Sequence, residues 1–381
     1  FLLESVTGGE IKGRYSVIGM KPDLIWKCNL RWSEINKNAL ENSNNFIKQK
    51  EPPIESLKAL IKECYINIPD NLPAMSAGLF GYLSYEMINF VKNVSDLSKI
   101  NLELPQSVLF RPSIIVIIDN VKGEIIVINP IWFNSNNIDK IPVKEIYENS
   151  KKILADTIDI ISVSTKIYGN YTKFTRRNRK KFKPISNFSK NTFLKNIQKA
   201  IRYIRMGDIL QVVLSQRWQI NFKNHPFSFY RALRKTNPSP YMFFFNFKNF
   251  QIVGASPEIL VKVSKNKVTI RPIAGTRPRG INNTEDIYFE KDLLNDPKEN
   301  SEHLMLLDLG RNDVGKVSEI GSVKTTESFI IEKYSHVMHI VSNVEGKLHP
   351  NYDNVDALFA GLPAGTVSGA PKIRAMEIIN E

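Results

Sequence analysis

The sequence predicts an α+β fold with large mixed or antiparallel sheets. Most patterned segments are short runs of β-branched and aromatic residues, such as SIIVII (113–118) and YMFFFNF (241–247). Amphipathic helical segments lie between them without the regular alternation of a parallel βαβ sheet. The chain has 381 residues, of which 42% are hydrophobic, so it can bury a large core in one or two domains.

Strand-like runs dominate the first 165 residues, with a helical stretch near 54–65. These runs are RYSVIGM, DLIWKC, SIIVIID and EIIVINP. A polar loop and a basic run, KFTRRNRKKFK (173–183), follow. The basic run lies between two patterned regions, which favours a solvated linker over a binding tail. We therefore divide the chain into an N-terminal region (1–165), a linker (166–188) and a second region (189–381).

The second region begins with a predicted amphipathic helix at 189–206, which Gly207 ends, followed by a strand at 209–220. Further strands are predicted around 241–247, 251–263 and 267–276, with a turn at ASPE (255–258). Residues 296–310 have the start signals of a helix. Asp296 suits the N-cap, Pro297 suits the first turn, and Glu299 completes an Asp-x-x-Glu box. Gly310 is the predicted end of this helix.

Charge, apolar runs and cysteines exclude several classes of protein. The net charge is +14, but the lysines are scattered and no recognition motif accompanies them, so we predict no nucleic-acid partner. The apolar runs are too short to span a bilayer, so we predict no membrane association. Cys28 and Cys64 lack companions at metal-ligand spacing, which favours a reduced, cytoplasmic protein. The sequence starts at Phe1 without a signal peptide and stops within a predicted helix, so we expect a fragment.

Two segments could bind an anion or a metal ion. On the predicted helix, Glu302 stands beside an apolar stripe and could bind Mg²⁺ together with water and an anionic substrate. It could equally be a boundary glutamate that reaches solvent. The segment GLPAGTVSGAPK (361–372) is a Gly-rich turn that enters a helix, where free N–H groups favour an anion. A plain structural turn would have the same composition.

Other candidate groups are also ambiguous from sequence alone. In a predicted strand, His339 shares a face with Val337 and Val341, so it is either a catalytic residue or a core histidine. Glu258 follows a tight turn and is either a cleft carboxylate or a surface one. The stretch TIRPIAGTRPRG (269–280) places three arginines around an Ile-Ala-Gly-Thr core, which suggests an anion-facing loop. Motifs typical of α/β-hydrolases, zinc proteases and dinucleotide-binding enzymes are not present.

Taken together, the motifs resemble those of the chorismate-binding enzymes, and among them the large subunits of anthranilate synthases. The resemblance covers essentially the whole chain. The motifs that carry it are LLES, GDILQVVLSQ, NPSPYMFF, GASPE, PIAGTRPRG, SEHLMLLDLGRND, YSHVMHIVS and GTVSGAPKIRAME. It implies an α-β-β-α layered sandwich around a chorismate cleft in residues 189–381. It also implies a Mg²⁺-dependent lyase that makes anthranilate and pyruvate from chorismate and ammonia, the first step of tryptophan biosynthesis.

The resemblance also assigns roles to individual residues. It makes Glu302 a metal ligand, His339 an assistant of proton transfer during elimination and Glu258 the general acid near the C4 hydroxyl. Thr366, with Gly365 and the following amides, would hold a substrate carboxylate. The remaining predicted substrate-binding residues are Ala274, Gly275, Thr276, Ser368, Gly369 and Lys372.

Two positions separate the subfamilies of these enzymes. Isochorismate and salicylate synthases carry a water-activating Lys where this chain has Gln211, and an amide cannot act as that base. Aminodeoxychorismate synthases typically carry a Lys at the position of Ala274, which can attack C2 covalently. Both differences favour anthranilate formation, with ammonia supplied by a separate glutamine amidotransferase subunit in a hetero-oligomer.

Two separate segments resemble a tryptophan feedback site, although a hairpin packed on an N-terminal strand would also explain them. Its predicted residues are Glu4, Ser5, Asn237, Pro240, Tyr241, Met242 and Phe243.

The resemblance also indicates what the sequence lacks. Family members continue past the last predicted helix into a segment with a second metal-ligating glutamate and the Tyr and Arg that clamp a carboxylate, so we expect residues 1–381 alone to be inactive or nearly so. Isochorismate, aminodeoxychorismate or salicylate synthesis, and a non-catalytic tryptophan- or chorismate-binding fragment, remain alternatives.

Overall fold

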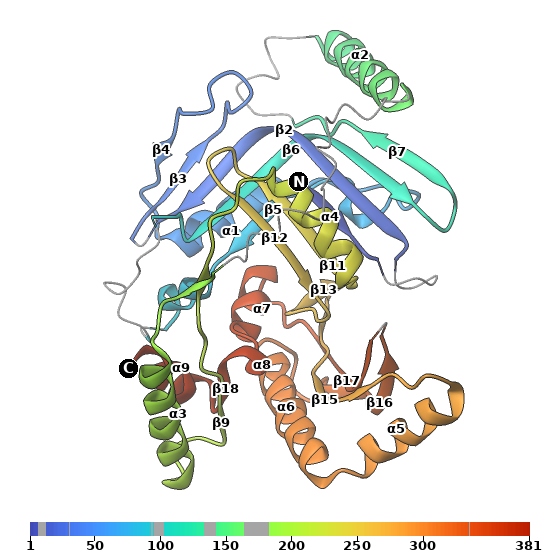
Figure 1. The fold of residues 1–381 in the computed structure, drawn as a ribbon. Coiled ribbons are helices and arrows are strands. Elements are labelled where there is room, and N and C mark those ends of the chain that lie inside the picture. The colour runs from blue at the N-terminus through green and yellow to red at the C-terminus, as the bar shows by residue number, and fades with distance from the viewer. Residues whose placement is uncertain are drawn as a thin grey trace.

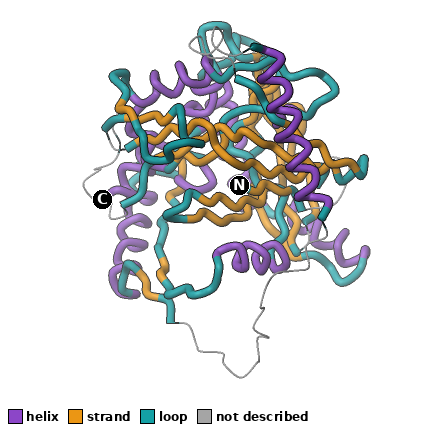
Figure 2. Tube along the Cα trace, turned by 90° about the horizontal axis from the view of Figure 1, so that it is seen from above, coloured by secondary structure: helices purple, strands orange, loops and turns teal. Residues whose placement is uncertain are grey.

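The computed structural model describes residues 1–6, 13–29, 31–92, 94, 103–132, 142–163, 183–334 and 336–381. Its described strands form two larger sheets in which every pairing is antiparallel (Figure 1). Helices lie around the crossing strands when the molecule is seen from above (Figure 2). The predicted α+β architecture with antiparallel sheets is therefore confirmed.

Nine described strands form the larger sheet, whose centre is β6 paired with β2, β5 and β7. Nearly every residue of β6 is buried, because its sequence SVLFRPSIIVIID is apolar on both faces. The runs RYSVIGM and DLIWKC, predicted separately, form one strand, β2, with a bulge opposite β6. The strands of this sheet are β1 (Leu2–Glu4), β2 (Tyr15–Cys28), β3 (Ser33–Asn36), β4 (Ile47–Lys48), β5 (Phe80–Leu83), β6 (Ser107–Asp119), β7 (Glu124–Ile128), β11 (Tyr241–Asn246) and β12 (Gln251–Ser256).

This sheet takes strands from both sides of the predicted linker. The N-terminal strand β1 lies between β2 and β11, so residues at the start of the chain pair with residues of the second region. Most of the linker (166–182) lies outside the described residues. The division into three regions therefore stays a prediction.

Five described strands form the smaller sheet, and the long strand β17 pairs with three of the others. They are β13 (Lys262–Ser264), β14 (Lys267–Ile270), β15 (Ile273–Pro278), β16 (Lys324–Lys333) and β17 (Val337–Lys347). Between β12 and β13 the chain turns at ASPE, as predicted.

The strand predicted at 209–220 was wrong in extent. Within it, two short pieces are strands, β9 (Gln211–Val212) and β10 (Trp218–Gln219). Each pairs with a two-residue partner, β18 (Gly369–Ala370) and β8 (Ile185–Ser186) respectively. Apolar pattern alone cannot extend a strand beyond the partner that accepts its hydrogen bonds.

The described helices cover the sheets and join them. They are α1 (Pro53–Glu63), η1 (Ala74–Ser76), η2 (Tyr85–Phe90), α2 (Val143–Ser162), α3 (Lys190–Arg205), α4 (Pro226–Thr236), α5 (Asn283–Asn295), α6 (Pro297–Gly315), α7 (Asn354–Gly361), α8 (Gly365–Ser368) and α9 (Lys372–Asn380). Helix α7 packs against both sheets. Its Val355 and Phe359 join the Trp26 cluster under the larger sheet, whereas Ala357 joins the Val268 cluster under the smaller one.

The start of α6 follows the prediction, but its end does not. Asp296 caps the helix and accepts hydrogen bonds from the N–H groups of residues 298 and 299. The helix continues through Gly310 to Gly315, and a side chain at Gly310 would place a Cβ 3.2 Å from Pro272 Cγ. Gly310 therefore allows close packing within the helix rather than ending it. The DLGRND residues consequently form the last turns of α6.

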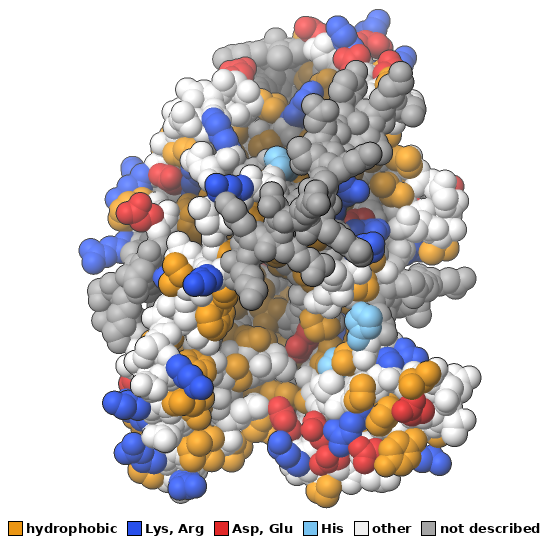
Figure 3. Space-filling model, in the orientation of Figure 1, with side chains coloured by type: hydrophobic (Ala, Val, Ile, Leu, Met, Phe, Trp, Pro, Cys, Tyr) orange, Lys and Arg blue, Asp and Glu red, His pale blue; other side chains and the backbone are white. Residues whose placement is uncertain are grey.

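Two surface properties bear on the predicted exclusions. None of the helices in the described ranges is long and apolar enough to cross a membrane. Among the described residues on the face in Figure 3, lysine and arginine side chains are dispersed between acidic and apolar ones.

Candidate active site

One side of α6 faces the predicted site residues. Glu302, Leu306, Leu309 and Asp313 recur at spacings of three or four positions, so they share that side. Gln211 reaches Glu302, Gly365 packs on Leu309, and Lys372 reaches Asp313. Residues from distant parts of the sequence therefore contact one side of α6.

Gln211 and Glu302 form the first of these contacts. The Gln211 Nε2 atom donates a hydrogen bond of 3.0 Å to Glu302 Oε1. Because a carboxylate only accepts hydrogen bonds, the amide nitrogen of Gln211 is the atom that faces Glu302. The Gln211 amide oxygen is buried and has no hydrogen-bond partner in the described structure. A buried acceptor in this state offers a place for an N–H donor of a ligand.

Glu302 fits the predicted magnesium site only as a single ligand. The described residues contain no group of three or more His, Cys, Asp or Glu side chains arranged to hold a metal ion. Mg²⁺ commonly takes one or two protein carboxylates and completes its shell with water and an anionic substrate. The chemistry of one carboxylate beside an amide is compatible with that mode.

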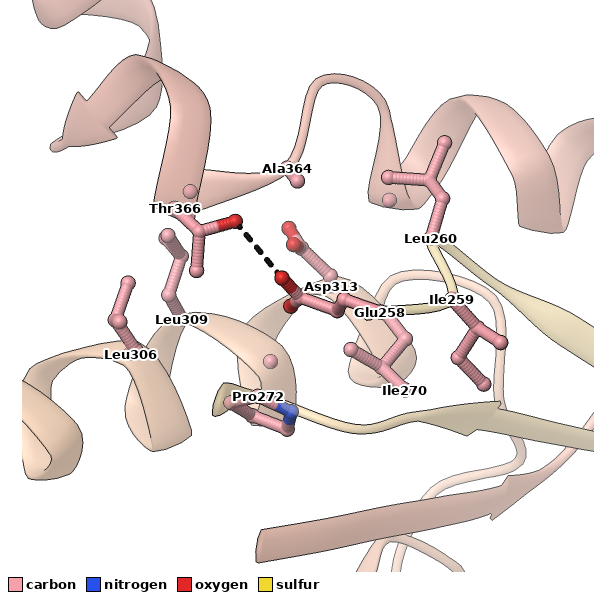
Figure 4. A pocket seen from close by; sticks show the side chains of 13 residues that line it. Glu258, Ile259, Leu260, Ile270, Pro272, Leu306, Leu309, Asp313, Ala364 and Thr366 are labelled. Atoms are coloured by element: carbon pink, nitrogen blue, oxygen red, sulfur yellow. Dashed lines mark hydrogen bonds between the residues drawn. The ribbon is translucent and has the colours of Figure 1, made fainter. Parts of the chain in front are cut away.

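Glu258 and Thr366 face each other across a small pocket (Figure 4). Thr366 Oγ1 donates a hydrogen bond of 3.2 Å to Glu258 Oε2. Burial raises the pKa of Glu258 to about 7, although the Thr366 bond opposes the shift. Glu258 is therefore a cleft carboxylate that is part protonated at neutral pH. The apolar part of the pocket wall consists of Ile259, Leu260, Ile270, Pro272, Leu306, Leu309 and Ala364.

His339 lies on β17 opposite the bulge of β15. Its Nδ1 atom is 3.0 Å from the Gly275 carbonyl oxygen and 3.0 Å from the Thr276 hydroxyl oxygen. A carbonyl only accepts, so Nδ1 carries the proton and Nε2 is left as the acceptor nitrogen. His339 is only partly buried, so it does not lie in the core, and its catalytic role stays a prediction. Gly275 has φ +72°, a conformation that favours glycine, and Ala274 beside it is buried.

The Gly-rich segment 361–372 packs tightly onto α6 and β9. A Cβ at Gly365 would lie 2.1 Å from Leu309 Cδ2, and one at Gly369 would lie 2.1 Å from the Gln211 carbonyl oxygen. Ser368 is fully buried and donates to the Ala364 carbonyl, whereas Lys372 bonds Asp313 and the Gly361 carbonyl. Ser368 and Lys372 thus have bonding partners inside the protein, and their predicted contacts with substrate stay predictions.

The expectation that the three arginines of TIRPIAGTRPRG face an anionic ligand was wrong. Each one forms an internal ion pair instead. Arg271 pairs with Glu327 and Glu332, Arg277 with Asp292 and Asp296, and Arg279 with Asp286. Sequence alone could not show this, because the acidic partners lie on α5, on β16 and at the start of α6.

The two segments of the predicted feedback site lie side by side. Strand β1 pairs with β11, so that Glu4 is opposite Met242 and Leu3 is opposite Phe243. Met242 and Pro240 are buried, Tyr241 and Asn237 are exposed, and Ser5 is partly buried. This geometry brings together residues that are far apart in the sequence; their binding of tryptophan stays a prediction.

Sequence reasoning missed three residues that hold these sites. Tyr230 and Arg234 of α4 both donate hydrogen bonds to the Glu4 carboxylate, the latter at 3.0 Å. Asp313 lines the Glu258 pocket. The i, i+4 spacing of Tyr230 and Arg234, and the continuation of the Glu302 stripe to Asp313, are the signals that could have found them.

Residues 21–381 match the family model described as chorismate binding enzyme. The chain belongs to this family. This chorismate binding enzyme is 52% identical over 381 residues to anthranilate synthase component 1 of Cereibacter sphaeroides, covering all of this chain and 75% of that one. The crystal structure of anthranilate synthase component I from Streptococcus pneumoniae superposes with a TM-score of 0.81 at 33% identity, covering 97% of this chain and 77% of that chain. The resemblance inferred from the motifs is therefore confirmed.

A more distant enzyme shares the fold alone. The menaquinone-specific isochorismate synthase from Escherichia coli superposes with a TM-score of 0.61 at 13% identity, covering 99% of this chain and 79% of that chain.

We predict that Gly365→Ala displaces α8 from α6, because the added methyl group would overlap Leu309. The expected result is a loss of thermal stability and of substrate turnover, measured by calorimetry and by the rate of chorismate consumption. Leu309→Ala in the same chain should restore part of both, since it opens the space that the methyl group needs. Equal losses in the single and double variants would contradict the packing account.

Proposed function

We propose that this chorismate binding enzyme is the large subunit of an anthranilate synthase. It would convert chorismate and ammonia to anthranilate and pyruvate, a lyase reaction of tryptophan biosynthesis. The observation that carries the proposal is the Gln211 amide, whose nitrogen bonds Glu302 and whose oxygen is buried without a hydrogen-bond partner among the described residues. An amide cannot deprotonate water, but its oxygen can accept an N–H bond from ammonia, a nucleophile that needs no base.

Glu258 is the proposed general acid. A carboxyl group with a pKa of about 7 can donate a proton to the C4 hydroxyl as that group leaves and amination proceeds at C2. Thr366 holds the Glu258 carboxyl in place with its hydroxyl. The apolar wall of the pocket limits water around the departing group.

His339 is the proposed assistant in the second step, in which pyruvate is eliminated and the ring becomes aromatic. The proton on Nδ1 is held by the Gly275 carbonyl, so Nε2 is the nitrogen free to accept a proton from the ring. Ala274, which neighbours this turn, is buried and carries no amine that could attack C2. Magnesium bound at Glu302 would hold the ring carboxylate and stabilise the negative charge that develops there.

Ammonia is proposed to come from glutamine through a separate amidotransferase subunit, in a cytoplasmic hetero-oligomer. Glutamine hydrolysis of that kind needs a reactive cysteine thiolate. Both cysteines of this sequence are buried, and burial raises the pKa of the Cys28 thiol to about 12 and that of Cys64 in the same direction. Neither thiol is suited to act as that nucleophile.

The assignment is tested by the product that the complete gene product forms from chorismate, Mg²⁺ and ammonium. We expect anthranilate and pyruvate in equal amounts, identified by mass. Gln211→Lys should add isochorismate or salicylate, because a lysine amine can activate water. A wild-type protein that forms isochorismate, salicylate or aminodeoxychorismate would contradict the proposal. Residues 1–381 assayed alone should form little anthranilate, and a rate equal to that of the complete protein would contradict this expectation.

We predict that kcat/KM for chorismate falls as the pH rises above about 7. The raised pKa means that the acid form of Glu258 is present below this value and is lost above it. Glu258→Gln should lower kcat/KM by about 10²- to 10⁴-fold, because an amide has no acidic proton to donate. The fall of kcat/KM above about pH 7, the basic limb of the profile, should then disappear. A pH profile that keeps the same limb in Glu258→Gln would assign it to another group.

We further propose that tryptophan inhibits the enzyme at the β1–β11 junction, where Glu4 would bind its ammonium group. Tyr230→Phe removes a hydrogen bond to Glu4, so tryptophan should inhibit more weakly while the uninhibited rate changes little. Tyr82→Phe is the matched control, since Tyr82 lies on β5 of the same sheet and its phenol bonds the Pro105 carbonyl rather than Glu4. Inhibition curves that shift equally in both variants would argue against this site.

A further inference from the structure

A buried ion pair lies behind the Glu258 pocket. Lys372 is 8% exposed and Asp313 is 4% exposed. The Lys372 amine bonds the Asp313 carboxylate and donates to the Gly361 carbonyl at 2.9 Å. The other Asp313 oxygen accepts from Lys316 at 2.9 Å. Two buried charges of opposite sign stabilise each other. Removing Asp313 leaves Lys372 uncompensated, whereas removing Lys372 leaves Asp313 with the half-exposed Lys316 as its cationic partner.

The Lys372–Asp313 pair also connects the two ends of the 361–372 segment, which contains Thr366. Gly361 ends α7 and Lys372 begins α9, so one amine joins both ends of this segment. Through Asp313 the same amine fastens the segment to α6. Gly361 packs closely on Val261, because a Cβ there would lie 2.3 Å from Val261 Cγ2. Thr366 is therefore held at a set position relative to α6 and to Glu258.

Asp313 also lies in the wall of the Glu258 pocket. Its carboxylate and that of Glu258 face the same space in Figure 4. The described residues that line the pocket come from the turn at 258–260, the β14–β15 connection, α6 and the 361–366 segment, and the titratable ones among them are Glu258 and Asp313. Lys372 lines a neighbouring cavity of about 690 Å³, which shares Leu309 and Asp313 with the pocket. The amine thus stands behind the carboxylate, on the side away from Glu258.

We propose that Lys372 and Asp313 are positioning residues that set the charge balance of the Glu258 pocket, with Lys372 neutralising Asp313 so that an anionic substrate can bind. Lys372 does this without touching the substrate. The choice of chorismate as the assayed substrate rests on the proposed function. The geometric part, that Lys372 acts on Glu258 through Asp313, does not.

The two single variants should shift the pKa of Glu258 in opposite directions. Lys372→Met leaves a negative Asp313 beside Glu258, which favours the protonated form of Glu258 and repels the substrate carboxylates. We expect KM for chorismate to rise about tenfold and the basic limb of kcat/KM to move up by about half to one pH unit. Asp313→Asn leaves an uncompensated Lys372, so that limb should move down by a similar amount.

Two further variants separate charge from structure. Lys316→Met removes a lysine that bonds the same carboxylate but is half exposed, so its charge is screened and KM and the pH profile should change little. The double variant Asp313→Asn/Lys372→Met removes both buried charges, and its pH limb should return toward the wild-type position.

The experiment uses the complete gene product and records KM, the pH profile and thermal stability for each variant. It also follows the pKa of Glu258 by NMR titration of ¹³C-labelled carboxyl groups, with Glu258→Gln to assign the signal. Wild-type protein without anthranilate formation would overturn the proposed function, but the NMR shifts would still test the ion pair. Shifts of Glu258 in the same direction in both single variants, or none, would overturn the charge-balance proposal and leave a structural clamp.

Discussion

The packing of the 361–372 segment against α6 is the constraint on which the rest of the site depends. Gly365 rests on Leu309 with no space for a side chain, and Lys372 bonds Asp313 one turn further along the helix. Because Glu302 lies on the same side of α6, this packing sets where Thr366 stands relative to the predicted metal ligand. Helix α7, which contributes to both cores, anchors the start of the segment.

Charge in the site is controlled by burial and by pairing. Burial raises the pKa of Glu258, whereas Asp313 shares its charge with two lysines. The arginines around β15 form ion pairs with acidic residues of neighbouring elements. They therefore stabilise this segment rather than attract a ligand. Glu258 is thus a carboxyl group of the cleft that can exchange a proton near neutral pH.

Local sequence signals predicted much of this arrangement. The cap at Asp296, the turn before Glu258 and the meeting of LLES with NPSPYMF all follow from short-range chemistry or from motif resemblance. The sequence predictions were wrong where a residue far away in the sequence determines the local structure. Gly310 is a helix-ending residue by composition, yet it lies against Pro272 inside α6. The Lys372 amine likewise has a partner that the local sequence does not reveal, because it bonds Asp313, 59 positions away, and its predicted contact with substrate stays a prediction.

We propose that Gln211 and Ala274 direct ammonia to C2 of chorismate, and a nitrogen label on the product shows whether they do. The complete protein is incubated with chorismate, Mg²⁺ and ¹⁵N-ammonium, and the product is analysed by NMR. We expect a single labelled product, anthranilate, with ¹⁵N on the ring carbon next to the carboxyl-bearing one. Label at C4, or a product without nitrogen, would contradict it.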